Sequence, residues 1–345
     1  MQLSFRWFGD SDAVTLAKIR QVPGVEGIVT SLHDRAPGEA WPFDAVTRVR
    51  DTVHEAGLTV TVIESIPVSE DIKLGRAGRD RAVDAWCESL QHVGEAGIGV
   101  VCYNFMPIFD WLRTDLARVM PDGSTTLAFD HEVLDAMDLS GGLRTLPAWA
   151  DTYDGPALAA LLAAYRALPD DALWEHLAWF LDRVVPVAES VGVKLALHPD
   201  DPPWPVLGVP RIVRDLAALQ RVTSLVDRPA NGITFCTGSL SASPGRDLPA
   251  MVRALEGRIH FAHCRNVKVT GHHCFVETPH PSRFGDVDMR AVLLALRETG
   301  FTGPMRPDHG RMIWGETGRA GYGLHDRALG AMYLQGLWEG LTPPS

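Results

Sequence analysis

The sequence lacks any apolar run long enough to span a bilayer, and it does not begin with a basic segment followed by an apolar stretch. These absences argue against a membrane protein and against a secretory signal peptide. Cysteine is also scarce, since the five thiols are odd in number and show no CxxC spacing. This usage argues against a disulfide framework and predicts reduced thiols in the cytoplasm, where single cysteines are available as metal ligands.

Positive charge is in deficit, because 32 Lys and Arg residues face 43 Asp and Glu residues and the formal net charge is −11. Such a balance argues against nucleic acid and against an anionic membrane surface as partners. It does not exclude an anionic small molecule, because a metal ion and a few arginines make a positive pocket even in an acidic protein. The sequence is therefore more compatible with a small-molecule enzyme than with a nucleic-acid-binding protein.

Low-complexity tracts and linker-like runs are missing as well, and short β-rich segments alternate with helical ones. Segments rich in Val, Ile, Phe or Thr predict strands at 3–7, 27–32, 59–65, 99–104, 193–198, 233–236, 258–263 and 303–306. Eight strand-then-helix units predict a parallel sheet with crossover helices, and a closed (β/α)8 barrel, or TIM barrel, is its simplest form. The GxGxxG turn typical of an open doubly wound sheet is absent.

The helical segments have apolar residues at helical spacing, and we expect helices at 43–56, 79–96, 173–191 and 288–299. Nearly ninety residues separate the fourth and fifth strands, where one helix would be enough. We therefore expect a single domain over 1–345 with a helical insertion at about 110–172, which covers the catalytic face or forms a subunit contact. The middle of this insertion, Ser140-Gly141-Gly142, is expected to be mobile.

The last four predicted strands each end in or near a good metal ligand: His198, Cys236, His263 and Asp308. The carboxyl ends of the strands meet at the active-site face of a barrel, so ligands on four consecutive strands converge there. Two imidazoles, a thiolate and a carboxylate suit a borderline divalent ion such as Mn²⁺, Fe²⁺, Co²⁺ or Zn²⁺. Any one of these residues alone is more typical of an ordinary loop, but four in register predict a metal site.

Three arginines, Arg6, Arg265 and Arg306, are predicted beside the metal ligands. Arginine binds a carboxylate through two parallel hydrogen bonds, although salt bridges at the barrel rim are the alternative. Asn104 ends the fourth strand and is a fourth candidate for substrate binding. Asp200 and Asp201 are candidates for orienting the His198 ring.

Two further residues are candidates for proton transfer. His309 directly follows Asp308 and acts either as an acid or base or as a residue that orients the loop. Tyr322 lies between two glycines that allow close approach of the backbone to a ligand, a pattern that plain turns share. The His-rich stretch 272–280 favours a solvated loop that folds over substrate, with a second metal site as the alternative.

Several long strings make the sequence similar to the mannonate dehydratase family from 5–7 to the end of the chain. These strings are Cys102-Tyr103-Asn104-Phe105-Met106-Pro107, Trp111-Leu112-Arg113-Thr114-Asp115-Leu116, His198-Pro199-Asp200-Asp201-Pro202-Pro203, Cys236-Thr237-Gly238-Ser239, Arg306-Pro307-Asp308-His309-Gly310 and Gly321-Tyr322-Gly323. The chain departs from many members at Phe5 and Phe8, where Trp and Tyr are usual, and at Cys264.

The resemblance implies a xylose-isomerase-like barrel, a divalent metal that is commonly Mn²⁺, and conversion of D-mannonate to 2-dehydro-3-deoxy-D-gluconate and water in hexuronate catabolism. It assigns the metal to His198, Cys236, His263 and Asp308, and acid–base catalysis to His309 and Tyr322, without saying which of the two is the base. A homodimer is expected by analogy. A metal-dependent sugar isomerase or epimerase on the same barrel and a non-catalytic sugar-acid-binding protein are the alternatives.

Overall fold

The computed structural model of the chain describes residues 1–140, 153–169 and 171–341. Gly141 and Gly142 of the segment expected to be mobile therefore lie outside the described residues. Among the described residues, no helix combines the length and the apolar composition that a membrane crossing requires.

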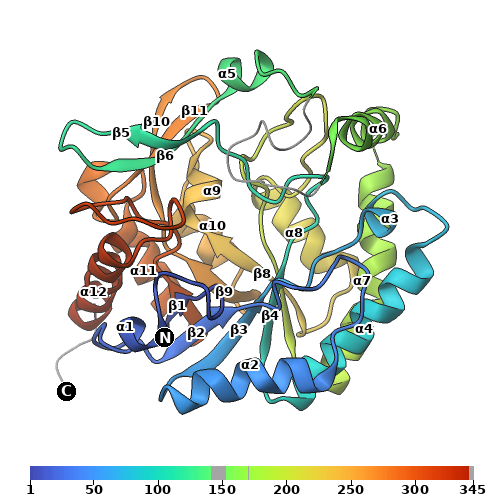
Figure 1. Cartoon of the computed structure of the whole chain (residues 1–345), viewed down its shortest axis with the longest axis horizontal. Coiled ribbons are helices and arrows are strands. Elements are labelled where there is room, and N and C mark those ends of the chain that lie inside the picture. The colour runs from blue at the N-terminus through green and yellow to red at the C-terminus, as the bar shows by residue number, and fades with distance from the viewer. Residues whose placement is uncertain (141–152, 170, 342–345) are drawn as a thin grey trace.

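Eight parallel strands close into a barrel in the order β1-β12-β9-β8-β7-β4-β3-β2 (Figure 1). They are β1 (Gln2–Arg6), β2 (Gly27–Thr30), β3 (Thr59–Glu64), β4 (Val100–Tyr103), β7 (Lys194–Leu197), β8 (Asn231–Cys236), β9 (Ile259–His263) and β12 (Pro304–Arg306). The predicted TIM barrel is thus confirmed, and each predicted strand end agrees to within two residues. All six residues of β8 are buried, as expected for a strand covered on both faces.

Helices surround the barrel (Figure 1). The longer ones are α2 (Phe43–Glu55), α4 (Arg79–Glu95), α7 (Ala172–Ser190), α8 (Leu216–Leu225), α10 (Leu248–Ala254), α11 (Met289–Glu298) and α12 (Leu324–Gly340). Short helices occur at α1 (Leu16–Ile19), α3 (Glu70–Lys73), α9 (Thr237–Ser241) and η2 (Ser282–Phe284). The local rules are visible in α11, where the Asp288 side chain accepts a hydrogen bond from the Ala291 amide and Gly300 follows with a φ of 70°.

The insertion after β4 contains strands as well as helices. β5 (Asp115–Val119) and β6 (Thr125–Asp130) form an antiparallel hairpin, and α5 (His131–Asp135) and α6 (Gly155–Arg166) follow. The prediction of a helical insertion is therefore right for α5 and α6 and wrong for β5 and β6. The reason is tertiary: β6 pairs with β11 (Cys274–Thr278), more than a hundred residues away, and β11 pairs with β10 (Asn266–Gly271).

These four strands form a second sheet in the order β10-β11-β6-β5. It lies on the side of the carboxyl ends of the barrel strands, because β10 follows β9 almost directly and β5 and β6 belong to the segment that follows β4 (Figure 1). The rings of Phe129 on β6 and Phe275 on β11 stack with their centroids 5.9 Å apart. The stretch 272–280, expected to be a solvated loop, is thus mostly an ordered strand with Glu277 and His280 buried.

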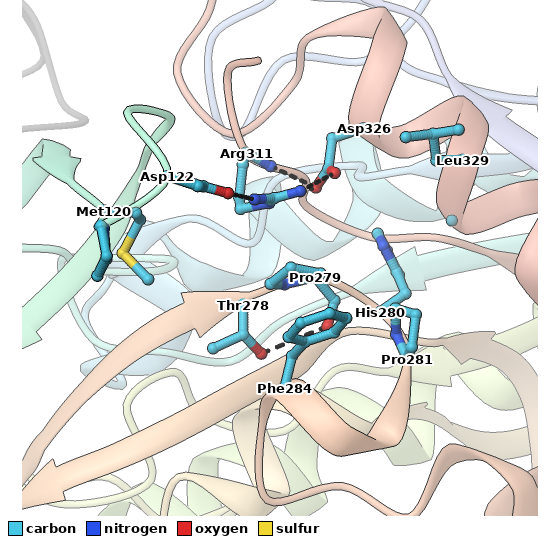
Figure 2. A pocket seen from close by; sticks show the side chains of 12 residues that line it. Met120, Asp122, Thr278, Pro279, His280, Pro281, Phe284, Arg311, Asp326 and Leu329 are labelled. Carbon is cyan, nitrogen blue, oxygen red and sulfur yellow. Dashed lines mark hydrogen bonds and ion pairs between the residues drawn. The ribbon is translucent and has the colours of Figure 1, made fainter.

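An ion-pair bridge ties the second sheet to the barrel. Figure 2 shows Arg311 between Asp122, in the turn from β5 to β6, and Asp326 on α12, with N–O distances of 2.6 and 2.9 Å. Below this bridge lies a mainly apolar cavity of about 480 Å³ whose walls include Phe284 and Leu329. None of the predicted catalytic, substrate-binding or metal-ligand residues lines this cavity, although His280 of the candidate stretch 272–280 does. The bridge anchors the loop between β12 and α12, which carries His309 and Tyr322.

Candidate active site

A polar cavity of about 630 Å³ opens at the carboxyl ends of the barrel strands. All the predicted site residues except Cys236 line it, and the Cys236 thiol is fully buried beside Asp308. The residues that line the cavity come from seven different strand ends and from the loop before α12. The barrel topology therefore brings together residues that are more than three hundred positions apart in the chain.

The four predicted metal ligands form one cluster. A ring nitrogen of His198, one of His263 and Cys236 Sγ lie within 4.8 Å of one another, and His198 Nε2 lies 3.1 Å from His263 Nδ1. Asp308 completes the cluster, with Oδ2 3.9 Å from Cys236 Sγ and Oδ1 3.6 Å from His263 Nδ1. His198, Cys236 and His263 thus form a group that could hold a metal ion, and the Asp308 carboxylate lies next to this group.

The chemistry of this donor set fits a divalent cation. The Nδ1 atom of His198 lies 2.6 Å from the carbonyl oxygen of Pro199, so the ring proton is held there and the Nε2 lone pair faces the cluster. On the other side, Nε2 of His263 accepts a hydrogen bond from Arg306 Nε at 3.2 Å and lies 3.3 Å from Glu64 Oε1. The prediction that Asp200 and Asp201 orient His198 is wrong, because the backbone of Pro199 does so.

A neighbouring group of possible ligands, Glu64, Cys102 and His263, shares His263 with the cluster. The Arg306 guanidinium already occupies this group, since its Nε lies 3.2 Å from His263 Nε2 and its Nη2 lies 3.1 Å from Glu64 Oε1. Burial, and secondarily the charge of Glu64, raises the pKa of the Cys102 thiol well above its ordinary value, so the sulfur is neutral. A guanidinium and a neutral thiol argue against a second cation at this position.

The predicted acid–base residues are hydrogen-bonded to each other, with 2.9 Å between His309 Nε2 and the Tyr322 hydroxyl. The Trp111 ring lies 5.2 Å from the His309 ring, and the Phe8 ring contacts Tyr322 edge-on at 4.7 Å. Burial, reinforced by the charge of Asp308, raises the pKa of Tyr322 to about 12. The phenol therefore keeps its proton at neutral pH.

The four residues predicted to bind substrate all line the cavity, but they differ in how far their polar groups are already paired. Arg306 contacts Asp308 at 2.7 Å, and Arg265 contacts Asp201 at 2.7 Å. Arg6 is less fully paired: it donates to the carbonyl of Glu64 and lies 3.8 Å from its carboxylate. Asn104 accepts one hydrogen bond, from the Met106 amide at 3.2 Å, through its side-chain oxygen.

Sequence reasoning missed several residues of the cavity and its surroundings. Glu64 had a usable signal, since it ends β3, and so did His33, which follows β2. Arg319 lies in the loop before α12, and its guanidinium stacks 4.3 Å from the Phe8 ring centroid. Arg113 had no positional signal, because it belongs to the insertion, and Glu277 was a candidate only as part of the stretch 272–280, without a specific role. None of the possible metal-binding groups among the described residues includes a residue of 272–274.

Comparison with known proteins identifies the family of this chain. The family model described as D-mannonate dehydratase (UxuA) matches residues 1–343. Mannonate dehydratase 2 of Halalkalibacterium halodurans is 49% identical over 344 residues, which cover 99% of this chain and 100% of the relative. The crystal structure of mannonate dehydratase from Streptococcus suis serotype 2 superposes with a TM-score of 0.92 at 45% identity, covering 99% of this chain and 95% of that one.

A more distant structure supports only the fold. The xylose isomerase domain protein from Planctomyces limnophilus is 13% identical, with a TM-score of 0.52 over 98% of this chain and 96% of that one. This likeness confirms the xylose-isomerase-like barrel. The family match over nearly the whole length and the identity of almost half the residues go further: the chain belongs to the mannonate dehydratase family.

Proposed function

We propose that this chain is a hydro-lyase that removes water from D-mannonate to give 2-dehydro-3-deoxy-D-gluconate. The observation that carries the proposal is the hydrogen-bonded pair His309 and Tyr322, which lies in one cavity with His198 and His263 of the possible metal-binding group and with Asp308. Dehydration of a sugar acid needs a base for the proton on C2, an acid for the departing hydroxyl on C3, and a way to offset negative charge beside the carboxylate.

His198, Cys236, His263 and Asp308 would hold a divalent metal, with Mn²⁺ as the expected ion and Fe²⁺ as an alternative. When bound, the metal withdraws electron density from the substrate carboxylate and so makes the weakly acidic hydrogen on C2 easier to remove. The mixed nitrogen, sulfur and oxygen donor set supports a borderline ion more than the hard ions Mg²⁺ or Ca²⁺, which prefer oxygen ligands alone.

The protein's own side chains bind the substrate and move the protons. Arg6 and Asn104 are the best candidates for direct contacts, since fewer of their polar groups have protein partners than those of Arg265 and Arg306. His309 is the proposed base, acting through Nε2, and Tyr322 is the proposed acid, because its raised pKa keeps the phenol protonated. Buried Arg265 and Arg306 hold carboxylates in place and add positive potential around the reacting carbons.

Incubation of the Mn²⁺-loaded protein with D-mannonate tests the function directly. We expect stoichiometric formation of a 2-keto-3-deoxy acid, measured by mass spectrometry as the loss of one water and by a colour reaction for 2-keto acids. An isomerase or epimerase would give a product of unchanged mass, and a sugar-acid-binding protein would show binding by calorimetry without any product. Either result would contradict the proposed dehydration.

The expected location and assembly are also proposals. Reduced thiols and the absence of cysteine pairing support the cytoplasm, and all five cysteines are free. A homodimer is proposed by analogy with the family, and sedimentation equilibrium at several protein concentrations would test it.

A further inference from the structure

Glu277 lies on β11, outside the barrel, yet its carboxylate reaches the proposed acid–base pair. Both of its oxygens contact Nδ1 of His309, at 2.9 and 3.0 Å, while Nε2 of the same ring faces Tyr322. An ionised carboxylate only accepts hydrogen bonds, so this contact holds the His309 proton on Nδ1 and leaves the lone pair on Nε2. The three side chains form one hydrogen-bonded chain from the second sheet into the cavity.

Arg265 also approaches this ring, with Nη1 2.9 Å from His309 Nδ1. A guanidinium only donates, so it bonds Nδ1 solely in the tautomer that has its proton on Nε2. Arg265 Nη1 also has carboxylate acceptors, 3.2 Å away on Glu277 and 3.4 Å away on Asp308. Glu277 is therefore the partner that decides the position of the His309 proton.

A buried ring of charges fixes the Glu277 carboxylate. Arg113 and Arg265 each contact both Glu277 and Asp201, so the four side chains close a ring of alternating charge with N–O distances from 2.6 to 3.2 Å. All four are at most 2% exposed. The backbone is held as well, since the Thr126 hydroxyl on β6 donates to the Glu277 carbonyl at 3.0 Å. These contacts leave the carboxylate little freedom to move away from His309.

The same surroundings keep the carboxylate ionised. Burial raises the pKa of Glu277, but the charges of His309, Arg265 and Arg113 outweigh burial and lower that pKa to about 2. The two arginines offset two carboxylates within the ring, so the ring itself is neutral. Glu277 therefore presents a charged acceptor to His309 at every pH at which the enzyme is expected to work.

We infer that Glu277 is a positioning residue for the dehydration, which sets the tautomer and the orientation of the His309 ring. The inference rests on the proposed role of His309 as the base. A carboxylate behind an imidazole fixes which nitrogen bears the proton and prevents the ring from rotating away from its partner. The second sheet thereby contributes to the reaction, because a bare (β/α)8 barrel would leave Nδ1 of His309 without this acceptor.

Glu277→Gln tests the inference, because the amide preserves the shape of the side chain but loses the charge and one acceptor. We expect kcat for D-mannonate to fall about 10–100-fold, the usual effect of losing an outer partner of a functional histidine. KM and the bound Mn²⁺ per chain, measured by elemental analysis, should change little. Glu298→Gln is the control, since it makes the same change of a carboxylate to an amide at an exposed ion pair with Arg253, away from the cavity; its kcat should remain within about twofold.

A double substitution separates positioning from general damage. If Glu277 acts through His309, Glu277→Gln should cost almost nothing when His309→Asn is already present. Full additivity of the two losses, or normal turnover of Glu277→Gln, would overturn the inference.

Glu277→Asp is the second variant, in case Glu277→Gln fails to fold. It retains the negative charge within the ring of charges but withdraws the carboxylate by one methylene group. An unchanged kcat in that folded variant would equally overturn the inference. Normal turnover of His309→Asn alone would instead refute the proposed function.

Discussion

Replacement of Cys236 by Ser is expected to abolish dehydration of D-mannonate. It should also weaken Mn²⁺ binding by more than roughly 10–100-fold, which is the loss typical of removing an outer-sphere contact. The Cys236 sulfur is completely buried and faces Asp308 and the two imidazoles, so no solvent molecule replaces a lost thiolate easily. A hydroxyl is a much poorer anionic ligand than a thiol, because it is not ionised at neutral pH. Equilibrium dialysis followed by elemental analysis measures the metal affinity, and the 2-keto acid assay measures turnover.

The matched control is Cys87→Ser, which makes the same chemical change on α4, away from the cavity. This variant should bind Mn²⁺ and turn over D-mannonate like the unaltered protein. Retention of full metal affinity by Cys236→Ser would remove the thiolate from the ligand set and leave only three of the proposed donors.

The second large effect is expected at the acid–base pair. His309→Asn and Tyr322→Phe should each lower kcat by about 10²–10⁴-fold, the usual contribution of a positioned acid or base. Tyr322→Phe removes only the hydroxyl that lies 2.9 Å from His309 Nε2, so the ring packing against Phe8 is retained. Metal content should stay near that of the unaltered protein, because neither residue is among the proposed ligands.

Single-turnover measurements with D-mannonate deuterated at C2 distinguish the two roles. A base variant should slow cleavage of the C–H bond and increase the isotope effect on kcat, whereas an acid variant should slow loss of the hydroxyl. Near-normal turnover in both variants would exclude the pair from the mechanism.

The barrel and the meeting of the four proposed metal ligands at one end of it were predictable from the sequence for a simple reason. Parallel strands buried on both faces are short continuous apolar segments, and the barrel geometry places every strand end on one face. His198, Cys236, His263 and Asp308 could therefore be brought together without knowing any distance. The resemblance to the mannonate dehydratase family rests on the same strand ends, so the two lines of reasoning agree.

The second sheet was not predictable in the same way. Strands β5 and β6 lie inside a segment where helices were expected, and β6 gains its stability from β11, whose residues come from beyond β9. Neither hairpin buries its apolar face alone, so the signal that decides their structure is a contact between distant segments. The sequence placed Glu277 in a candidate loop, but its contact with His309 could not be predicted, since it depends on where the sheet places the residue.

The pairing of charged residues with one another could not be predicted from the sequence either. The sequence places Arg265 and Arg306 near strand ends, but it does not show that carboxylates already contact both guanidinium groups. Their charge is therefore used largely within the protein, and Arg6 and Arg319 remain as the arginines of the cavity with fewer carboxylate contacts.

Crystallographic measurement of anomalous scattering at the manganese edge, on crystals grown with Mn²⁺, tests the central claim most directly. The account predicts one strong peak per chain, within bonding distance of His198 Nε2, Cys236 Sγ, a ring nitrogen of His263 and the Asp308 carboxylate. A peak bound by other residues, or none in this cavity in a protein that converts D-mannonate, would contradict it.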